Sequence, residues 1–446
     1  MVELSGWGLY PRVQCKLVEP DTERDVRRAL DVEGTIPRGL GRSYGDAAVN
    51  DRRTVLGLTK FDRVLGFDEA TGEVRCEAGV SLSQLIEHFA GRGWFPKITP
   101  GTRYVTIGGC IANDVHGKAH HAHGSFLESV KSMRVLLASG QVVTASRSEN
   151  ADLFFASFGG MGLLGVILEA TVQLRKVSTT FFKQRSFEAK NLEALLDLIL
   201  EQDKQFPYSV ASINPLYTGE RLGFGVLTAG DHAAPEELPA KFASDPLRGN
   251  GNAFLDVPFM LPEFTVNAAT LRLVHLLGHQ FLMRGAPIAH ADSFFYPLDV
   301  LLGAWNRGYG KRGFTQYQLV IPKEDGARNL RALLETIVAA NQLPSLNVLK
   351  KLGKENAAPL SFPTEGWTLA IDFPVIDGLA ELFARLDAMV ADFGGRVYLG
   401  KDAFLHADTF ARMYPRLPAW RAVKQKYDPQ GVFSSNLSRR VGLTER

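Results

Sequence analysis

The sequence predicts a protein of two domains in which strands and helices are mixed, and three observations support this prediction. The chain has 446 residues, which exceeds the size of one ordinary hydrophobic core. Three glycine-rich turns, each beside an apolar strand pattern, lie between residues 34 and 177. After residue 313, strand and helix patterns alternate twice, which indicates one sheet covered by helices.

The composition excludes several functional classes. The 50 basic and 48 acidic residues leave a net charge of +2, so we expect no broad basic face for nucleic acid. The three cysteines lack metal-ligand spacing and suit a reducing compartment. The first 16 residues lack the apolar core of a signal peptide, and no apolar run is long enough to span a bilayer. We therefore expect a cytoplasmic or peripherally membrane-associated protein.

Short strands and helices are expected in order along the first 177 residues. Ser81 is expected to cap a helix over residues 82–92, because apolar side chains recur on one face of it. Two turns, at residues 69–72 and 139–140, are expected to join strands as hairpins. The other expected helices cover residues 22–30 and 149–155. The expected strands cover residues 34–37, 54–58, 63–68, 73–78, 130–137 and 142–146, and the glycine-rich turn that begins at residue 159 leads into one more.

Residues 98–126 form the glycine-rich segment on which the functional prediction depends. Its five glycines allow sharp turns and a close approach of the backbone to a bound group. Backbone N–H groups freed in this way can hold phosphates. Apolar side chains such as Ile98, Ile111 and Phe126 anchor the segment, so we expect an ordered functional loop with no clear helix of its own.

The character of the sequence changes near Ser178. We expect a helix over residues 188–202, strands over 209–214 and 222–228, and an exposed loop over 233–252. Beyond that loop, strands over residues 313–322, 345–350 and 367–373 are expected to alternate with helices over 326–341 and 378–393. Residues 261–287 contain the segment TLRLVHLLGHQFLMR, for which a core helix is favoured and a lipid-contacting interfacial segment is the alternative.

Three motifs could carry chemistry, and each has a plainer alternative. RGLGRSYGD, residues 38–46, lacks the spacing of a dinucleotide fingerprint and could be only a tight turn, but three such turns together favour a large anionic cofactor. His116 lies beside Lys118 and three further histidines, which favours a functional site over a structural histidine. These histidines lack the spacing of metal ligands, so no metal site is predicted. Lys401, in YLGKDAF, is either a solvated partner of Asp402 or a buried lysine with a lowered pKa.

The chain resembles one family through seven segments that occur in order: RGLGRSYGD, PGTRYVTIGGCIANDVHGKAHHAHGSF, GGMGLLGVI, FYPLD…WNRGYG, GFTQYQLVIP, PLSFP…GW…DFP and YLGKDAF…MYPRLPAW. These look like the flavoprotein oxidase family of decaprenylphosphoryl-β-D-ribose 2′-epimerases, within the vanillyl-alcohol-oxidase-like flavoproteins. The resemblance implies an α+β, two-domain PCMH-type FAD-binding fold. The FAD-binding domain would comprise residues 1–179 and 396–446, and a sheet-and-helix substrate domain would comprise residues 180–395.

The resemblance also implies FAD and the residues that bind it. The first glycine-rich turn has no histidine to which a flavin could be tethered, so the expected FAD is non-covalent. The implied catalytic residues are Lys401, which contacts the reacting hydroxyl and could act as the base, and His116. The implied substrate residues are Tyr296, Gln316, Gln318, Lys350 and Lys401. The implied cofactor-binding residues are Pro37, Arg38, Gly39, Leu40, Gly41, Arg42, Ser43, Tyr44, Gly45, Asp46, Ala47, Gly101, Thr106, Ile107, Gly108, Gly109, Asn113, Asp114, Val115, His116, Ile167 and Tyr398.

The implied reaction oxidises the ribose 2′-hydroxyl of a lipid-linked polyprenyl-phosphoryl ribose to a 2′-keto sugar, with a quinone or oxygen as electron acceptor. A partner NAD(P)H-dependent keto-reductase would complete the epimerisation to the arabinose donor for cell-envelope glycans. The alternative enzyme is an alditol or aldonolactone oxidase that uses oxygen. The alternative that is not an enzyme is a carrier that binds lipid-linked sugars and keeps FAD only as structure. One departure concerns Ala370, where actinobacterial members of the family carry cysteine.

Overall fold

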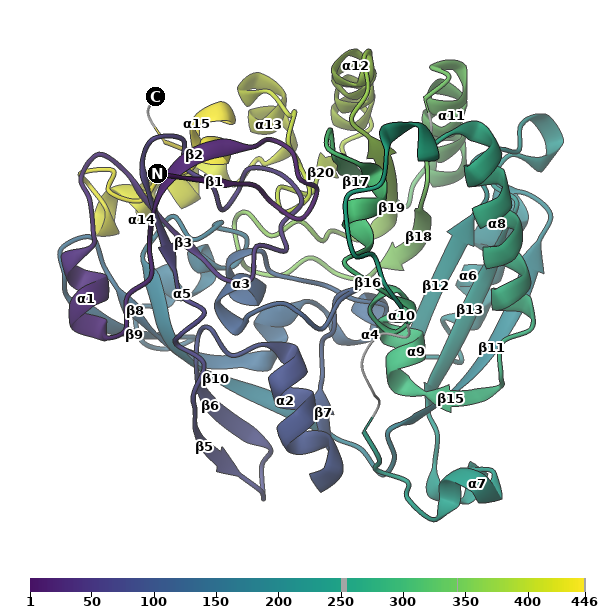
Figure 1. The fold of residues 1–446 in the computed structure, drawn as a ribbon, viewed down its shortest axis with the longest axis horizontal. Coiled ribbons are helices and arrows are strands. Elements are labelled where there is room, and N and C mark those ends of the chain that lie inside the picture. The colour runs from purple at the N-terminus through teal and green to yellow at the C-terminus, as the bar shows by residue number, and fades with distance from the viewer. Residues whose placement is uncertain (250–254, 343, 445–446) are drawn as a thin grey trace.

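The computed structural model describes residues 1–249, 255–342 and 344–444, and Figure 1 shows the arrangement of their elements. Residues up to 176 build two sheets, with strand orders β1-β2-β4-β3 and β5-β6-β10-β8-β9, and β7 also pairs with β10. The strands of these two sheets are β1 (Val2–Leu4), β2 (Val13–Val18), β3 (Thr35–Arg38), β4 (Thr54–Gly57), β5 (Val64–Asp68), β6 (Glu73–Glu77), β7 (Trp94–Pro96), β8 (Val130–Leu136), β9 (Val142–Ser146) and β10 (Val166–Lys176).

Local sequence explains the helices and hairpins of this part. Helix α1 (Glu23–Arg28) begins after Thr22, whose side chain accepts the N–H of Asp25. Helix α2 (Leu82–Phe89) begins with a capping box formed by Ser81 and Gln84, and it continues into η1 (Ala90–Arg92). The expected hairpins are confirmed by the antiparallel pairs β5–β6 and β8–β9. Helix α5 (Ala151–Ser157) follows β9.

The glycine-rich segment over residues 98–126 contains helices, so the prediction that it has none is wrong. Helix α3 (Ile107–Ala112) is followed by α4 (His120–His123) and by η2 (Phe126–Ser129). Thr106 caps α3 by accepting the N–H of Gly109. A Cβ at Gly108 would lie 3.2 Å from the Cβ of Ala78, so glycine lets α3 pack directly on the chain after β6. This packing outweighs the low helix propensity of glycine.

Residues 181–397 build one eight-stranded sheet with the order β15-β11-β13-β12-β18-β19-β17-β20. Helices α6 (Leu192–Gln202), α11 (Gly326–Ala339) and α12 (Leu379–Asp392) pack in a row and contact strands of this sheet. The strands are β11 (Phe181–Ala189), β12 (Tyr208–Ile213), β13 (Gly225–His232), β15 (Ile288–His290), β17 (Phe314–Pro322), β18 (Asn347–Leu352), β19 (Gly366–Pro374) and β20 (Arg396–Val397).

Two expectations for this sheet need correction. Strand β11 was not predicted, and its last residues had been assigned to a helix over 188–202 that in fact begins at Leu192, after the Asn191 cap. Strand β13 begins at residue 225 rather than 222. The loop expected over residues 233–252 contains two short helices, η4 (Pro235–Glu237) and α7 (Ala240–Ala243), and residues 250–252 lie outside the described part.

The C-terminal segment returns to the first two sheets. Its helices are α13 (Ala407–Met413), α14 (Leu417–Tyr427) and α15 (Asn436–Arg440). Trp420 of α14 is buried and donates its indole N–H to the carbonyl oxygen of Ala156, and Phe433 forms a parallel bridge with Thr35. The C-terminal helices therefore pack on the part of the fold that contains β3 and α5 (Figure 1). The domain boundaries at residues 179 and 396 stay predictions; β20 pairs with β17 of the large sheet.

The segment over residues 261–287 is not a core helix, so the favoured prediction for it is wrong. It contains η5 (Glu263–Thr265) and α8 (Ala268–Met283), and α8 exposes most of its apolar side chains. Figure 1 shows α8 beside β11 and β13, which it contacts. Nearby lie a small sheet of β14 (Leu255–Asp256) and β16 (Leu302–Gly303), the helices α9 (Ala291–Phe295) and α10 (Pro297–Leu301), and η6 (Trp305–Tyr309). A further turn, η3 (Gly219–Arg221), precedes β13.

Candidate active site

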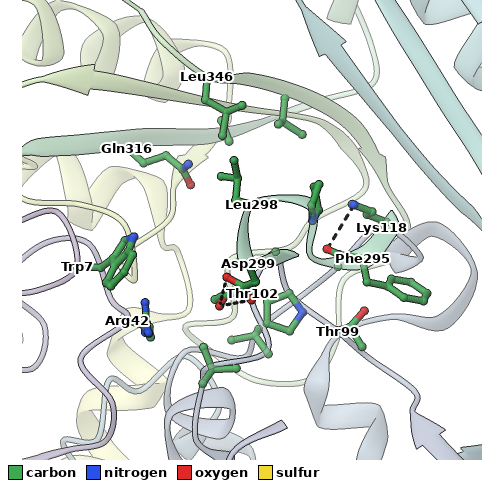
Figure 2. A pocket seen from close by; sticks show the side chains of 18 of the residues that line it. Trp7, Arg42, Thr99, Thr102, Lys118, Phe295, Leu298, Asp299, Gln316 and Leu346 are labelled. Carbon is green, nitrogen blue, oxygen red and sulfur yellow. Dashed lines mark hydrogen bonds between the residues drawn. The ribbon is translucent and has the colours of Figure 1, made fainter. Parts of the chain in front are cut away.

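A cavity of about 1130 Å³ lies between the glycine-rich turns and the large sheet. Its lining comes from all three turns, from the chain around residues 398–401, and from strands β11, β12, β13, β17, β18 and β19. Figure 2 shows side chains such as Arg42, Leu298 and Gln316 pointing into this space from different parts of the fold. The volume exceeds the roughly 300–1,000 Å³ of sites for drug-sized ligands, so the cavity has room for a large cofactor as well as a substrate.

The first glycine-rich turn presents backbone donors to the cavity. Within the described residues, the N–H groups of Leu40, Gly41, Arg42 and Ser43 donate to no protein acceptor. Gly41 has φ +65°, a conformation that favours glycine, and a Cβ at Gly39 would lie 2.3 Å from the Oγ1 of Thr106. The first two turns therefore touch each other, and consecutive free N–H groups of this kind suit the phosphates of a dinucleotide.

A second set of contacts fixes the turn over residues 398–402 against the first glycine-rich turn. Tyr44 donates its backbone N–H to the carbonyl oxygen of Gly400. A Cβ at Gly45 would lie 1.8 Å from the carbonyl oxygen of Asp402, so the two segments meet without space for a side chain. Arg440 bridges the carboxylates of Asp46 and Asp402 at 2.7 and 2.8 Å. Residues more than 350 positions apart thus form one wall.

Lys401 borders the cavity at the centre of this wall. Its Nζ lies 3.5 Å from the centroid of the Tyr44 ring, a distance that allows a cation–π contact. Burial lowers the pKa of Lys401 to about 7; the Asp372 carboxylate opposes this shift and Lys350 adds to it. Asp372 lies opposite Gln316 in the β17–β19 ladder, and Gln316 donates its side-chain N–H to Oδ1 of Asp372. A lysine of this kind is able to exchange a proton near neutral pH.

His116 lies in the same cavity beside Gln318. The side-chain amide of Gln318 donates to Nε2 of His116 at 2.9 Å, which leaves the proton of the neutral ring on Nδ1. Nδ1 is buried and has no hydrogen-bond partner in the described chain. Burial lowers the pKa of His116 far below its ordinary value, and Lys350 adds to the shift. His116 is therefore neutral and offers an unused donor beside the rings of Tyr398 and Phe362.

Two more buried lysines border the cavity. Burial lowers the pKa of Lys350, on β18, to about 8. Burial also lowers the pKa of Lys118 to about 7, and its Nζ donates to the carbonyl oxygens of Phe294 and Phe295 (Figure 2). Both side chains line the cavity, as does Ala370 of β19. This part of the cavity suits an anionic group on a substrate.

The comparisons with known proteins agree with this geometry. The FAD binding domain family matches residues 16–146, and the D-arabinono-1,4-lactone oxidase family matches residues 311–441. Decaprenylphosphoryl-β-D-ribose oxidase of Mycolicibacterium smegmatis is 37% identical over 451 residues, which cover 99% of this chain and 97% of that protein. The chain belongs to the decaprenylphosphoryl-β-D-ribose oxidase family. It is thus an FAD-dependent oxidoreductase that acts on a CH–OH group, and its α+β two-domain fold is as predicted.

Lactone-oxidising proteins are more distant relatives of this member of the decaprenylphosphoryl-β-D-ribose oxidase family. L-gulonolactone oxidase of Mus musculus is 32% identical over 434 residues, which cover 90% of this chain and 88% of that protein. L-gulono-1,4-lactone dehydrogenase of Mycobacterium tuberculosis is 23% identical over 454 residues, which cover 98% of each chain. These matches extend over both predicted domains.

Most of the predicted site residues line the cavity, and five do not. Asp114 is buried and accepts hydrogen bonds from the Ser125 and Ser361 hydroxyls, so it holds the wall together from behind. The two predicted catalytic residues, Lys401 and His116, line the same cavity as the predicted substrate residues Gln316, Gln318 and Lys350. The residues outside the lining are Gly45, Asp46, Ile107, Asp114 and Tyr296. Their roles toward cofactor or substrate stay predictions.

The sequence analysis missed several lining residues. Lys118 was noted as a neighbour of His116 but given no role. Trp7, which lies under the guanidinium of Arg42 at 3.8 Å, gave no signal beyond its place in an aromatic turn. Asp299 accepts from the Thr102 hydroxyl and ties the second turn to α10 (Figure 2). The inner face of α8, with His275 and His279, was also missed.

The clustered histidines of residues 116–123 serve separate contacts. His120 accepts the N–H of Gly353 through Nδ1, whereas Nε2 of His121 lies 3.2 Å from the carbonyl oxygen of Phe206. His123 lies beside Arg175. In the part of the chain that the structure describes, no three His, Cys, Asp or Glu side chains gather as a metal-ligand set.

Proposed function

We propose that this enzyme oxidises the 2′-hydroxyl of a polyprenyl-phosphoryl-β-D-ribose to the 2′-keto sugar. One observation carries the proposal: the cavity joins a lysine-rich polar end to a passage along α8 that is lined in part by apolar side chains. The polar end contains Lys118, Lys350 and Lys401, and Phe281 and Leu282 border the passage. A sugar phosphate attached to an apolar chain likewise has a polar, charged end and an apolar end. The family relationship supports the same substrate class.

We infer that the first two glycine-rich turns hold the pyrophosphate of FAD and that the chain around His116 and Tyr398 holds its flavin. The free N–H groups of residues 40–43 supply the donors for the phosphates. His116 has a free Nδ1–H with which to contact the flavin or the sugar. When bound, FAD supplies the hydride acceptor for oxidation of the alcohol.

We infer that Lys401 binds the reacting 2′-hydroxyl and accepts its proton. A base with a pKa near the working pH is the most effective one, and burial brings Lys401 into that range. Gln316 and Asp372 form a hydrogen-bonded pair on adjacent strands, and the charge of Asp372 favours the protonated form of the lysine. Lys401 is thus the group on this chain that is best placed to move the proton.

Lys350 is assigned to the substrate phosphate. The phosphodiester of a polyprenyl-phosphoryl sugar is attached at C1′, the carbon next to the reacting C2′, and Lys350 on β18 lines the same cavity as Lys401. A bound phosphate would stabilise the charged form of this lysine, whose pKa burial has lowered to about 8. Lys118 is a second cation for the same group.

Oxidation of the alcohol leaves two electrons and two protons to be passed on. We propose a quinone or oxygen as the acceptor. The keto sugar is then the substrate for a reductase that uses NAD(P)H and delivers hydride to the opposite face of C2′, which completes the change from ribose to arabinose. This pair of reactions supplies the arabinose donor for cell-envelope glycans.

A visible spectrum of the purified enzyme tests the proposal. Short-chain polyprenyl-phosphoryl ribose, added without oxygen, is expected to bleach the flavin bands, and product analysis is expected to show the 2′-keto sugar. Xylitol and L-gulono-1,4-lactone serve as controls at the same concentration. Bleaching by the controls alone would replace the proposal with an alditol or aldonolactone oxidase, the alternative that the match to lactone oxidases over residues 311–441 favours. Flavin bands that no substrate bleaches would indicate a carrier.

We also propose that FAD is bound without a covalent link. The first glycine-rich turn offers Arg42, Ser43 and Tyr44, and none of these is a histidine. Acid precipitation is expected to leave the yellow colour in the supernatant, and a pellet that keeps its flavin absorbance would contradict this assignment.

A further inference from the structure

Exposed apolar side chains are concentrated on one part of the molecule. In most soluble proteins such residues are scattered singly, and a contiguous group marks a binding surface. Leu277 of α8 is 58% exposed, and Phe264, before α8, is 78% exposed. Most of the exposed large apolar side chains of the described chain come from residues 255–301: Leu255, Phe259, Phe264, Leu273, Val274, Leu276, Leu277, Phe281, Met283 and Leu301.

Helix α8 turns its polar side toward the protein and its apolar side outward, which is the reverse of an ordinary surface helix. Its side toward the protein carries His275 and His279, and Nε2 of His279 lies 2.8 Å from the Glu188 carboxylate on β11. Leu271 is the buried apolar member of the helix. The outer side carries Leu273, Leu276 and Leu277, which are more than half exposed. We call these three leucines the α8 outer face. A helix with polar residues inside and leucines outside is expected where the outside is not water.

The charged residues of α8 and of the chain next to it are of one sign. Residues 264–291 contain no Asp or Glu, whereas Arg272 and Arg284 lie near the two ends of α8. Both arginines are exposed. Apolar residues flanked by basic ones suit a membrane whose surface is anionic. Across the described ranges, no helix combines the length and hydrophobicity needed to cross a bilayer. The surface therefore suits a helix that lies in the interface rather than across it.

The α8 outer face continues into the cavity. Val274, Phe281 and Leu301 are exposed and also line the cavity, and the next residue inward on α8 is Leu282. Across from α8, the strands offer Val210, Val226 and small polar side chains. Helix α8 is thus the boundary between the outside apolar surface and the passage that leads to Lys401. Val274, Phe281 and Leu282 offer apolar contacts along this boundary, beside the polar side chains of His275 and His279.

We propose that the α8 outer face docks on an anionic lipid bilayer, so that the lipid tail of the substrate passes along α8 from the bilayer into the cavity. This inference rests on the proposed function, because it requires a substrate with a long apolar tail. The continuity of the face with the cavity favours a bilayer over a second copy of the chain, which would cover the passage.

Vesicle binding by the FAD-loaded enzyme tests the proposal. The probe is a sedimentation assay with vesicles of phosphatidylglycerol and phosphatidylcholine in equal parts, compared with phosphatidylcholine alone. The wild type is expected to sediment with the anionic vesicles. The double variant Leu273→Glu/Leu277→Glu is expected to bind at least tenfold more weakly. These two leucines do not line the cavity. The matched control is Leu200→Glu/Val338→Glu, which charges exposed apolar residues on α6 and α11 and is expected to bind as the wild type does.

Two activity assays separate this inference from the proposed function. The α8 variant is expected to oxidise a water-soluble short-chain polyprenyl-phosphoryl ribose at the wild-type rate, and a long-chain substrate embedded in vesicles at least tenfold more slowly. Equal rates on the embedded substrate, or unchanged vesicle binding, would overturn the docking proposal and leave the function standing. A dimer in the wild type that the variant abolishes would identify a second copy as the occupant and also overturn it. Failure of every preparation to oxidise the soluble substrate would instead overturn the proposed function.

Discussion

The two sides of the cavity are built in opposite ways. The wall around Lys401 is held by close backbone contacts, such as that between Gly45 and Asp402, and by the bridging side chain of Arg440. The opposite side, along α8, turns leucines outward and contacts the protein through residues such as Leu271 and His279. One side is fixed by many buried polar contacts, whereas the other has few.

This difference follows from what each side has to bind. Proton and hydride transfer depend on the position of the reacting atoms, so a displacement of about 1 Å can cost a large part of the rate. An apolar tail has no fixed geometry and requires only that water be excluded. The contrast therefore predicts that substitutions in the Lys401 wall act on chemistry and stability, whereas substitutions on α8 act on access.

The largest effect is expected from Lys401→Met. Methionine keeps the length of the side chain and removes the amine, so the flavin should bind normally while proton transfer is lost. We expect the rate of flavin reduction by substrate to fall by about 10²–10⁴-fold, the usual contribution of a general base. Anaerobic stopped-flow measurement of flavin absorbance checks this. The exposed lysine variant Lys354→Met is the matched control, and a Lys401→Met enzyme as fast as this control would remove Lys401 from the mechanism.

The next largest effect is expected from Arg440→Ala. Its loss leaves the carboxylates of Asp46 and Asp402, both buried, without their cation. Breaking a buried ion pair typically costs roughly 3–5 kcal/mol of unfolding free energy. Urea unfolding of the FAD-loaded enzyme checks this. The control is Arg412→Ala, which breaks an exposed pair with Asp392 and should cost less than about 1 kcal/mol. Equal losses of unfolding free energy in the two variants would contradict the conclusion that buried polar contacts fix the Lys401 wall.

A smaller effect is expected from Asp372→Asn, and it is measured as a shift in the pH dependence of kcat/KM. The neutral amine of Lys401 accepts the proton, so kcat/KM should rise with pH through the pKa of Lys401, which burial has lowered to about 7. The Asp372 carboxylate raises this pKa by favouring the ammonium form. Asparagine removes that charge, so the midpoint should move to lower pH by about one unit. The exposed variant Asp377→Asn should leave it in place. A midpoint that stays or moves upward would show that the titrating group is not Lys401.

The wall was more predictable from sequence than the α8 side. Glycine-rich turns such as Arg38–Asp46 are local signals, and their use for an anionic cofactor follows from backbone chemistry. The assembly of Lys401 with Gln316 and Lys350 came from the family resemblance alone, because no spacing brings residues from three separate segments together. Helix α3 was missed because glycine has a low helix propensity. The stabilisation from packing Gly108 against Ala78 is a tertiary contact, which propensity does not include.

The error over α8 has a different cause. Periodicity shows that a helix has an apolar side but does not show what that side faces. The leucines of α8 recur with the helical period. Histidines, however, occupy the inner positions where the prediction of a core helix expected leucines. Strand β11 was missed for a related reason: charged residues such as Lys183 and Arg185 interrupt its apolar pattern. A surface that binds something other than the protein itself is therefore the hardest part to predict from the sequence pattern.

The smallest effect separates the inner and outer sides of α8 directly. Leu271→Gln buries an amide in place of an apolar side chain, whereas Leu276→Gln makes the same change at a position that is 56% exposed. An unsatisfied buried polar group costs about 1–3 kcal/mol, and an exposed substitution changes stability by within about 0.5 kcal/mol. Since α8 is expected to open locally rather than with the whole protein, hydrogen exchange of its amides is the appropriate measurement. Exchange should be about tenfold faster in Leu271→Gln and unchanged in Leu276→Gln. If the two variants exchanged equally fast, α8 would have no preferred inner side, and the contrast between the two sides of the cavity would fail.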